Sequence, residues 1–258
     1  MENKTGIPRI IHYCWFGGNH LPPLAVKCIN SWKSFNPGYE IKEWNESNFD
    51  IDCNNYVKQA YAAKMYAFVS DYARFHILYN NGGIYMDTDV EVLRPLDIFL
   101  ANKMFTGFER TDKVAPGLIL GSEIKTNLMK VFMDGYKVRM FIDKTGNMDL
   151  TTVVDYTTEF LQRRGLLLNG IKQEVEGIII YPTDYFCPKS YETGECITTR
   201  NTYTIHHFAG SWKSSADHFK IRLAHLIGRS WMKKLSYIKR LLWRRKNDKN
   251  TDDIYPNI

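Results

Sequence analysis

Short apolar runs alternate along this chain with longer segments of helical periodicity. Runs of strand character occupy residues 9–15, 39–44, 83–86, 104–108, 118–120 and 177–181. Helical patterns lie at residues 24–35, 65–79, 126–141 and 152–163, and the first two end at Asn-Pro-Gly and Asn-Gly-Gly stop signals. Strands that alternate with helices favour an α/β fold with a mostly parallel central sheet.

The length of 258 residues allows one large domain or two small ones. With 44% hydrophobic and 24% charged residues, the composition excludes a disordered tail, a collagen-like fibre and a disulfide-stapled miniprotein. No internal repeat or low-complexity tract interrupts the pattern. We therefore expect one catalytic domain at residues 1–212 and an appendage at residues 213–258.

Cysteine use and hydropathy indicate the compartment. The five cysteines form no CxxC pair, and their spacing with nearby histidines fits no common zinc site. The opening segment MENKTGIPRI lacks the apolar core of a signal peptide, and no apolar run approaches the ~20 residues of a spanning helix. These features favour a cytoplasmic protein with reduced thiols.

The formal net charge of +6 is unevenly distributed. Residues 213–258 hold twelve Lys and Arg against four Asp, a charge of +8, which leaves −2 for residues 1–212. Apolar side chains recur with helical spacing through residues 219–243, with Lys and Arg between them. A basic amphipathic helix of this kind is drawn to anionic lipid. A helix packed on the domain and a nucleic-acid contact are the alternatives, and we favour peripheral association with the inner face of the cell membrane.

The segment GGIYMDTDVEVLRPLD is the sharpest local motif. Its short apolar strand runs into Asp87-Thr88-Asp89. Side chains two apart on an extended backbone point the same way, so Asp87 and Asp89 would present two carboxylates to one point. Such a pair suits Mg²⁺ or Mn²⁺. A polar turn is the competing interpretation.

Three further patches carry candidate side chains. Asp71 and Arg74 lie three apart on the predicted helix at 65–79, as a shared site or a surface ion pair. The strand at 9–15 ends in Trp15, which could stack on a base or fill the core. In IHHFAGSW, adjacent histidines cannot both point inward, so one at most is a ligand; Ser211 and Trp212 carry donors suited to phosphate.

Together the segments IPRIIHYCWFGG, SDYARFHILYNNGGIYMDTDVEVLRPLD and HHFAGSW resemble glycosyltransferase family 32. This group of DXD-containing sugar transferases includes bacterial capsular and lipopolysaccharide enzymes and yeast-type mannosyltransferases, and it is more distantly similar to the glucosylating domains of large clostridial toxins. The resemblance spans residues 7–212 in order and is weakest over residues 110–200. It implies a GT-A-like fold, a nucleotide-sugar donor, a divalent metal, usually Mn²⁺, and retention of the anomeric configuration.

The resemblance also implies roles for individual residues. Asp89 would bind the metal and Asp87 would hold the ribose or a metal-bound water. Asp71 and Arg74 would contact hydroxyls of the donor sugar and ribose. The remaining roles fall on Trp15, which would stack on the base, on His207, which would be a C-terminal metal ligand, and on Ser211 and Trp212, which would donate to the leaving diphosphate.

The resemblance implies a hexosyltransferase for a saccharide acceptor, which a capsule-type pathway would carry on a lipid. Two alternatives stay open at this point. A haloacid-dehalogenase-like phosphotransferase also places DxD after a strand, although this chain has Glu91 where that motif prefers Thr or Val. A non-catalytic basic adaptor would explain the C-terminal segment and leave the DxD unused. The sequence does not choose among UDP-hexoses, their N-acetylated relatives and GDP-mannose.

Overall fold

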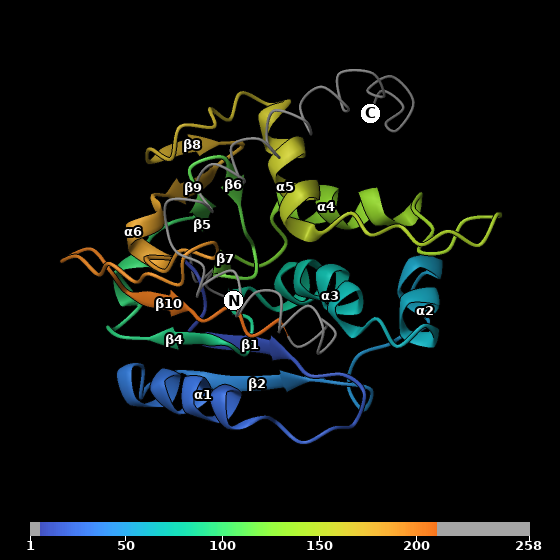
Figure 1. Cartoon of the computed structure of the whole chain (residues 1–258), viewed down its shortest axis with the longest axis horizontal. Helices are drawn as coiled ribbons and strands as arrows, with labels where there is room; N and C mark the ends of the chain where they lie inside the picture. The colour runs from blue at the N-terminus through green and yellow to red at the C-terminus, as the bar shows by residue number, and fades with distance from the viewer. Residues whose placement is uncertain (1–5, 211–258) are drawn as a thin grey trace, which may run out of the picture. The chain divides into compact units, whose positions relative to one another are not determined.

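The structure, a computed structural model of the chain, describes residues 6–210. Their central sheet has the order β2-β1-β3-β7-β5-β9-β8, with β6 paired to β5 (Figure 1). Its strands are β1 (Ile10–Cys14), β2 (Glu40–Trp44), β3 (Gly83–Tyr85), β5 (Met104–Arg110), β6 (Lys113–Val114), β7 (Leu120–Ser122), β8 (Gln173–Val175) and β9 (Ile178–Tyr181). A second sheet pairs β4 (Val90–Val92) antiparallel with β10 (Thr204–His206).

Most strands of the central sheet share one direction. β1 runs parallel to β2 and to β3, and β5 runs parallel to β9. β7 lies between β3 and β5 and is antiparallel to both, so the two parallel groups point the same way. The predicted α/β fold with a mostly parallel sheet is confirmed.

The helices are α1 (Pro23–Phe35), α2 (Asn55–Ala62), α3 (Tyr66–Asn81), α4 (Asn127–Lys137), α5 (Val153–Gln162) and α6 (Thr183–Phe186), with a 3₁₀ turn at Asp97–Phe99. Four of them match the predicted segments, and α2, α6 and the 3₁₀ turn are additional. α4 ends at Lys137, before the predicted end at residue 141, and Arg139 beyond this end binds Asp149. α2 was not predicted, since its signal is one Asn54 N-cap on eight residues.

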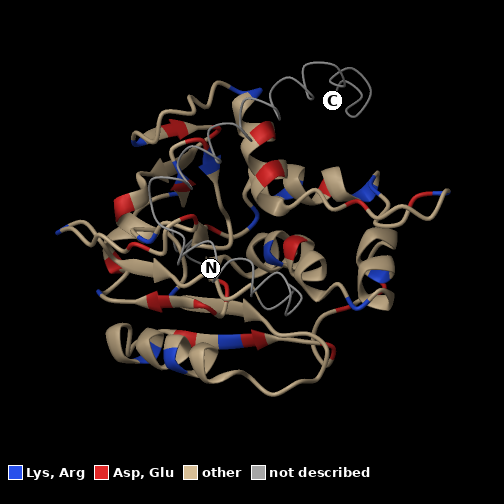
Figure 2. Cartoon of the chain, in the orientation of Figure 1, with Lys and Arg blue, Asp and Glu red and all other residues tan. Residues whose placement is uncertain are grey.

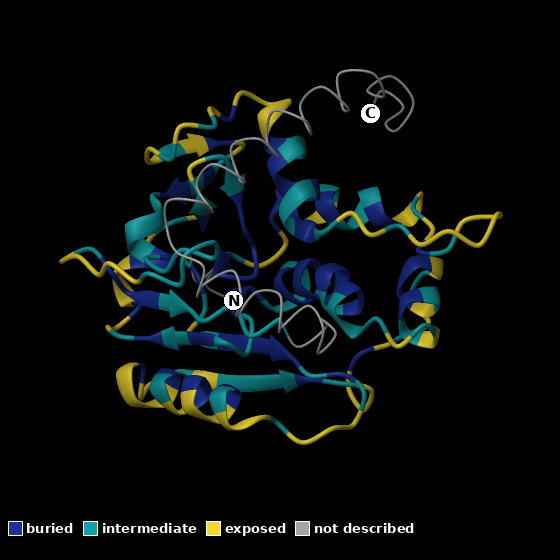
Figure 3. Ribbon diagram, viewed as in Figure 1, coloured by how far each residue is buried: buried dark blue, intermediate teal, exposed yellow. Residues whose placement is uncertain are grey.

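Alternation along the strands builds a core on each face of the sheet. Ile84 and Met86 belong to one buried cluster, together with Trp32 of α1, while Tyr85 belongs to the other, together with side chains of α2, α3, α4 and α5. Strands buried on both faces are typical of sheets covered by helices. Figure 3 shows α3 and the inner strands as buried, and α1 with one buried and one exposed face.

Of the described residues, 6–189 and 197–210 form one compact unit, and residues 190–196 are grouped with a second. The predicted boundary at 212/213 and the basic amphipathic segment lie outside the described residues and stay predictions. Figure 2 shows blue and red segments interspersed along the described chain. Within it, no helix has the length and apolar character needed to cross a membrane.

Candidate active site

Two glycines connect the helix that carries Asp71 to the strand that precedes the DXD motif. α3 ends at Gly82 with φ 62°, and Gly83 follows with φ 98°. A Cβ at Gly83 would lie 2.7 Å from the carbonyl oxygen of Ile10, so β1 and β3 approach closely here. The turn therefore places the start of β3 beside β1 and folds α3 over the same sheet.

Asp71, Arg74 and Asp87 form one buried ionic chain. Arg74 Nη2 donates to Asp71 Oδ1 at 2.9 Å and lies 3.5 Å from Asp87 Oδ1. The guanidinium lies over the Tyr85 ring at 4.8 Å, and the Tyr85 hydroxyl donates to Asp87 Oδ1 at 3.1 Å. The Arg74 side chain is 3% exposed and that of Asp71 10%, whereas that of Asp87 is 34% exposed. The predicted Asp71–Arg74 pair is thus buried, and Asp87 is the most exposed member of the ionic chain.

A contribution to the stability of the fold does not by itself explain why these three charged side chains are buried together. Removing two charges from water costs several kcal/mol per ion, and well-packed apolar residues often serve as well or better. Burial raises the pKa of Asp71 to about 6, although the Arg74 charge acts in the opposite direction. Burial also raises the pKa of Asp87, assisted by the nearby Asp89 charge and opposed by Arg74. A costly polar cluster of this kind is typical of a functional site.

Asp89 belongs to a different set of contacts. The chain leaves β3 at Tyr85 and makes a turn in which Val90 donates its N–H to the carbonyl of Asp87 at 3.1 Å. The extended backbone predicted for Asp87-Thr88-Asp89 is therefore wrong. Because the turn rotates the second carboxylate, Asp87 faces Arg74 while Asp89 faces the segment that follows β10.

Three donors from the end of β10 and the segment that follows it meet Asp89. His206 Nε2 lies 3.2 Å from Asp89 Oδ1, and the Ala209 N–H donates to Asp89 Oδ2 at 2.7 Å. The His207 N–H donates to the Asp89 carbonyl at 2.9 Å. His206 and these hydrogen bonds outweigh burial and hold the pKa of Asp89 at about 2. Asp89 is thus an ionised carboxylate that fixes the end of the described chain.

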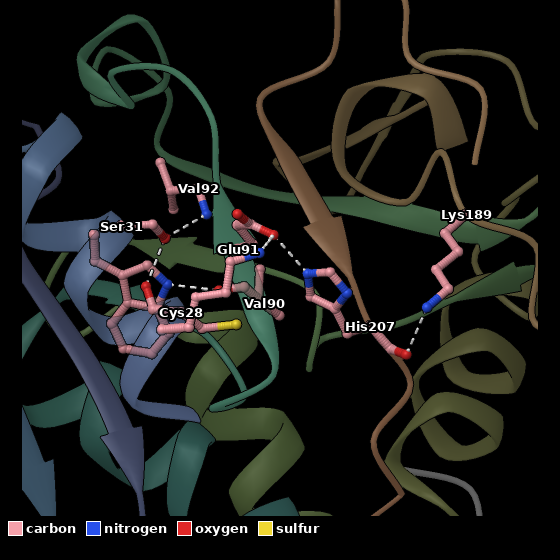
Figure 4. A network of polar contacts seen from close by, with 9 residues as sticks. Cys28, Ser31, Val90, Glu91, Val92, Lys189 and His207 are labelled. Atoms are coloured by element: carbon pink, nitrogen blue, oxygen red, sulfur yellow. Dashed lines mark hydrogen bonds and ion pairs between the residues drawn. The ribbon is translucent and has the colours of Figure 1, made fainter. Parts of the chain in front are cut away.

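The two histidines diverge, as expected for neighbours near a strand end. His207 Nε2 contacts Glu91 Oε2 at 2.7 Å, and the same oxygen accepts from Lys27 at 2.9 Å. Figure 4 shows the His207 ring turned toward Glu91 of β4 and its carbonyl accepting from Lys189. The structure thus places the side chain of His206, and not that of His207, against the Asp89 carboxylate. The ligand role assigned to His207 stays a prediction.

The donor set fits a divalent cation in kind. Asp87 and Asp89 supply carboxylate oxygens, and His206 adds an imidazole beside Asp89. Within residues 6–210, no three His, Cys, Asp or Glu side chains converge as a ready-made metal site. Mg²⁺ is usually bound by one or two carboxylates together with substrate phosphates, so a carboxylate pair is sufficient on the protein side.

The other predicted residues lie apart from these contacts or outside the described chain. Trp15 follows β1, is partly buried and donates its Nε1–H to the carbonyl of Asn19 at 2.6 Å. Ser211 and Trp212 lie beyond residue 210. Two residues of the site escaped sequence reasoning: His206, whose orientation required the turn geometry, and Gly117, whose carbonyl accepts the Asp87 N–H at 2.9 Å.

Comparisons with known proteins agree with this geometry. Residues 22–106 match the family described as "Glycosyltransferase sugar-binding region containing DXD motif". Inositol phosphoceramide mannosyltransferase 1 of Schizosaccharomyces pombe is 32% identical over 108 residues, which are 38% of this chain and 33% of that enzyme. The chain therefore matches about a third of the length of this relative.

A longer match has lower identity. The uncharacterized glycosyltransferase L373 of Acanthamoeba polyphaga mimivirus is 26% identical over 223 residues, covering 83% of this chain and 86% of the viral protein. Among solved structures, the PaToxG glycosyltransferase superposes with a TM-score of 0.51 at 15% identity, covering 61% of this chain and 70% of that one. The latter likeness confirms the expected GT-A-like fold.

The family match covers Asp71, Arg74, Asp87 and Asp89, which the structure gathers at the carboxyl end of β3. This match favours a glycosyltransferase over a phosphotransferase of the haloacid-dehalogenase type. Residues 22–106 thus contain a sugar-binding region of the DXD-motif glycosyltransferase type.

Proposed function

We propose that this chain transfers a hexosyl group from a nucleotide-sugar, UDP-linked in our preferred reading, to a saccharide acceptor. The transfer depends on a divalent metal and retains the anomeric configuration. One observation carries the proposal: the buried Asp71–Arg74–Asp87 chain is most exposed to solvent at Asp87, close to the Asp89 charge. Charged groups held in this way are available to polar groups of a donor that enters at the end of β3.

Asp71 and Arg74 act in the proposal as fixed partners for sugar and ribose hydroxyls. Asp71 Oδ2 accepts the Val153 N–H at 3.1 Å, and its Oδ1 is held by Arg74, so the carboxylate cannot rotate freely. Arg74 Nη1 is buried and has no hydrogen-bond partner among the described residues. A buried guanidinium N–H without an acceptor is costly, and a donor hydroxyl would satisfy it.

Asp87 and Asp89 are the residues that would hold Mn²⁺ or Mg²⁺. Such a cation would stabilise the negative charge that develops on the diphosphate as the sugar leaves. Asp89 is ionised at any working pH because its pKa is about 2. Asp87 stays hydrogen-bonded to Tyr85, which orients its carboxylate. On the same argument we propose His206 as the histidine nearest to the cation, with His207 bound to Glu91.

Ser211 and Trp212 complete the proposed donor site as hydrogen-bond donors to the leaving diphosphate. They follow the segment that Asp89 fixes through Ala209, two residues before Ser211. Trp15 is proposed to stack on the base at the end of β1. The sequence shows no obvious nucleophile for the sugar, and retention would then follow from attack by the acceptor on the face that the diphosphate leaves.

For the acceptor we propose a saccharide carried on a lipid, in synthesis of a cell-surface polysaccharide at the inner face of the cell membrane. Two features support it: the basic amphipathic pattern at residues 219–243 and the relatives named inositol phosphoceramide mannosyltransferases. Those names also make GDP-mannose a donor to be tested beside the UDP-hexoses. The basic segment supplies attraction to anionic lipid headgroups.

The donor is identified by incubating the full chain with a panel of nucleotide-sugars and Mn²⁺ and measuring released nucleotide. We expect turnover with one or two hexose donors and loss of turnover with chelator. Flotation with anionic vesicles tests the membrane part, and neutral vesicles are the control. No turnover with any donor, in the presence or absence of short saccharide acceptors, would contradict the proposed function.

A further inference from the structure

The loop between β6 and β7 reaches the DXD motif at Gly117. Ala115, Pro116, Gly117 and Leu118 form a turn that is closed by the Leu118 N–H donating to the Ala115 carbonyl at 3.1 Å. The whole turn is buried. The Gly117 carbonyl accepts the Asp87 N–H at 2.9 Å, so the turn is joined directly to the first DXD carboxylate residue.

Gly117 leaves no space for a side chain. A Cβ built on it would lie 2.1 Å from Asp87 Oδ2 and 3.0 Å from Arg74 Nη1. Real Cβ atoms do not approach other heavy atoms within 3.0 Å, so the Asp87 carboxylate would have to move. Its Oδ1 is the atom that meets Arg74 and the Tyr85 hydroxyl, and these contacts would be lost with the movement.

Backbone conformation does not require glycine here. Gly117 is absent from the glycines with positive φ, in contrast to Gly82 and Gly83. An alanine would therefore adopt the same backbone without strain, and the requirement for glycine is one of space alone. The nearest atoms that a methyl group would meet belong to Asp87 and Arg74 of the ionic chain.

We propose that Gly117 is a positioning residue of the donor site: its missing side chain lets the Asp87 carboxylate lie against Arg74 Nη2, while Arg74 Nη1, buried and without an acceptor among the described residues, is left for a ligand hydroxyl. The kinetic part of this inference rests on the proposed function. The positional part does not, since it concerns the contact between residues 117 and 87 in the free protein. Gly117 touches the reacting groups only through Asp87 and Arg74.

The positional part is tested by a double-mutant cycle on thermal stability. Gly117→Ala is expected to lower the melting temperature in the natural background and to leave it nearly unchanged in an Asp87→Gly background, where no carboxylate meets the new methyl group. Gly107→Ala is the matched control, because a Cβ there would lie 2.7 Å from the Phe186 ring. Its effect should be equal in both backgrounds. Equal penalties for Gly117→Ala in both backgrounds would overturn the inference, whether or not the chain is an active transferase.

The kinetic part compares the same two variants in donor turnover. Gly117→Ala should lower kcat/KM for the nucleotide-sugar at least about 100-fold at a temperature where it is fully folded, as a misplaced catalytic group does. Gly107→Ala, whose added methyl group would meet the Phe186 ring and not the ionic chain, should stay within about threefold of wild type at that temperature. Turnover by Gly117→Ala within threefold of an active wild type would overturn the positioning role, and an inactive wild type would instead count against the proposed function.

Discussion

His206 Nε2 lies 3.2 Å from Asp89 Oδ1, while His207, its neighbour in the chain, contacts Glu91. The Asp89 carboxylate thus binds the end of β10 through His206 and the following segment through the Ala209 N–H. β4 itself is tied to α1, since Trp32 Nε1–H donates to the Val90 carbonyl at 2.6 Å. The second aspartate therefore joins two distant parts of the chain at the proposed metal position.

Replacing the two histidines separately distinguishes their roles. His206→Ala should raise the Mn²⁺ concentration for half-maximal turnover about 10–100-fold, the usual effect of losing a group that orients a metal ligand. His207→Ala is the matched control and should change it less than threefold, because its ring contacts Glu91. Metal titrations of donor hydrolysis measure both. A larger effect for His207→Ala would return the ligand role to His207, as sequence reasoning assigned it.

Breaking the buried ionic chain should destabilise the fold. Arg74→Met leaves Asp71 and Asp87 without their shared partner, and we expect the free energy of unfolding to fall by about 3–5 kcal/mol. Urea unfolding at neutral pH measures it. The exposed pair Arg163–Glu159 provides the control, and Arg163→Met should cost less than about 1 kcal/mol. Similar losses for both variants would contradict the account of Arg74 as a buried counter-ion.

We expect the pH dependence of the free energy of unfolding to report the protonation of His12, a residue of β1. Its Nε2–H donates to the Gly82 carbonyl at 2.9 Å and its Nδ1 accepts from Trp44 Nε1 at 3.1 Å, which fixes a neutral ring. Burial lowers the pKa of His12 from its ordinary value of 6.5 to about 4. The unfolded chain therefore binds more protons between those values, and the stability from neutral His12 is lost as pH falls from about 6.5 to 4.

The loss amounts to about 3 kcal/mol across that interval, since each pKa unit corresponds to about 1.4 kcal/mol. The measurement is urea unfolding at pH 7.5 and pH 4.5 for wild type and for His12→Asn. The variant starts from a lower stability and should show a shallower decline with falling pH. Parallel declines would contradict the assignment of a neutral, buried His12.

An ion pair between Arg139 and Asp149 supports the Asp71 side of the site. Arg139 donates through Nε and Nη2 to Asp149 Oδ2, at 3.0 and 2.7 Å, and this holds the segment that ends at Val153, whose N–H reaches Asp71. Arg139→Lys keeps the charge and loses the planar fork, so we expect about 1–3 kcal/mol less stability. Urea unfolding checks the loss. An unchanged unfolding midpoint would show that the segment is held by other contacts.

The order of most strands and helices could be predicted because they overlap apolar runs or segments of helical periodicity. β4, β6, β8 and β10 escaped prediction because each has three residues or fewer and contains a polar residue, whereas the equally short β3 and β7 overlap apolar runs. The importance of Asp71, Arg74, Asp87 and Asp89 was visible in the motif. Their grouping was not, since the turn after β3 separates the two aspartates and burial converts an expected surface pair into an internal one.

Gly117 and His206 show why the rest of the candidate site could be assigned only from the three-dimensional structure. Gly117 lies 30 residues beyond Asp87 in a turn whose sequence, Ala-Pro-Gly, signals only a change of direction. His206 and His207 are indistinguishable by type, and the choice between them depends on the pleat of β10 and its pairing with β4. Neither property can be read from local composition.

The central claim is that Asp89 serves a metal-dependent sugar transfer. The most direct measurement is Mn²⁺-dependent release of nucleotide from the preferred nucleotide-sugar, by wild type and by Asp89→Ala, with circular dichroism of both. The account predicts that the variant keeps its spectrum and loses turnover by at least about 100-fold. Full metal-dependent turnover by a folded Asp89→Ala variant would contradict it.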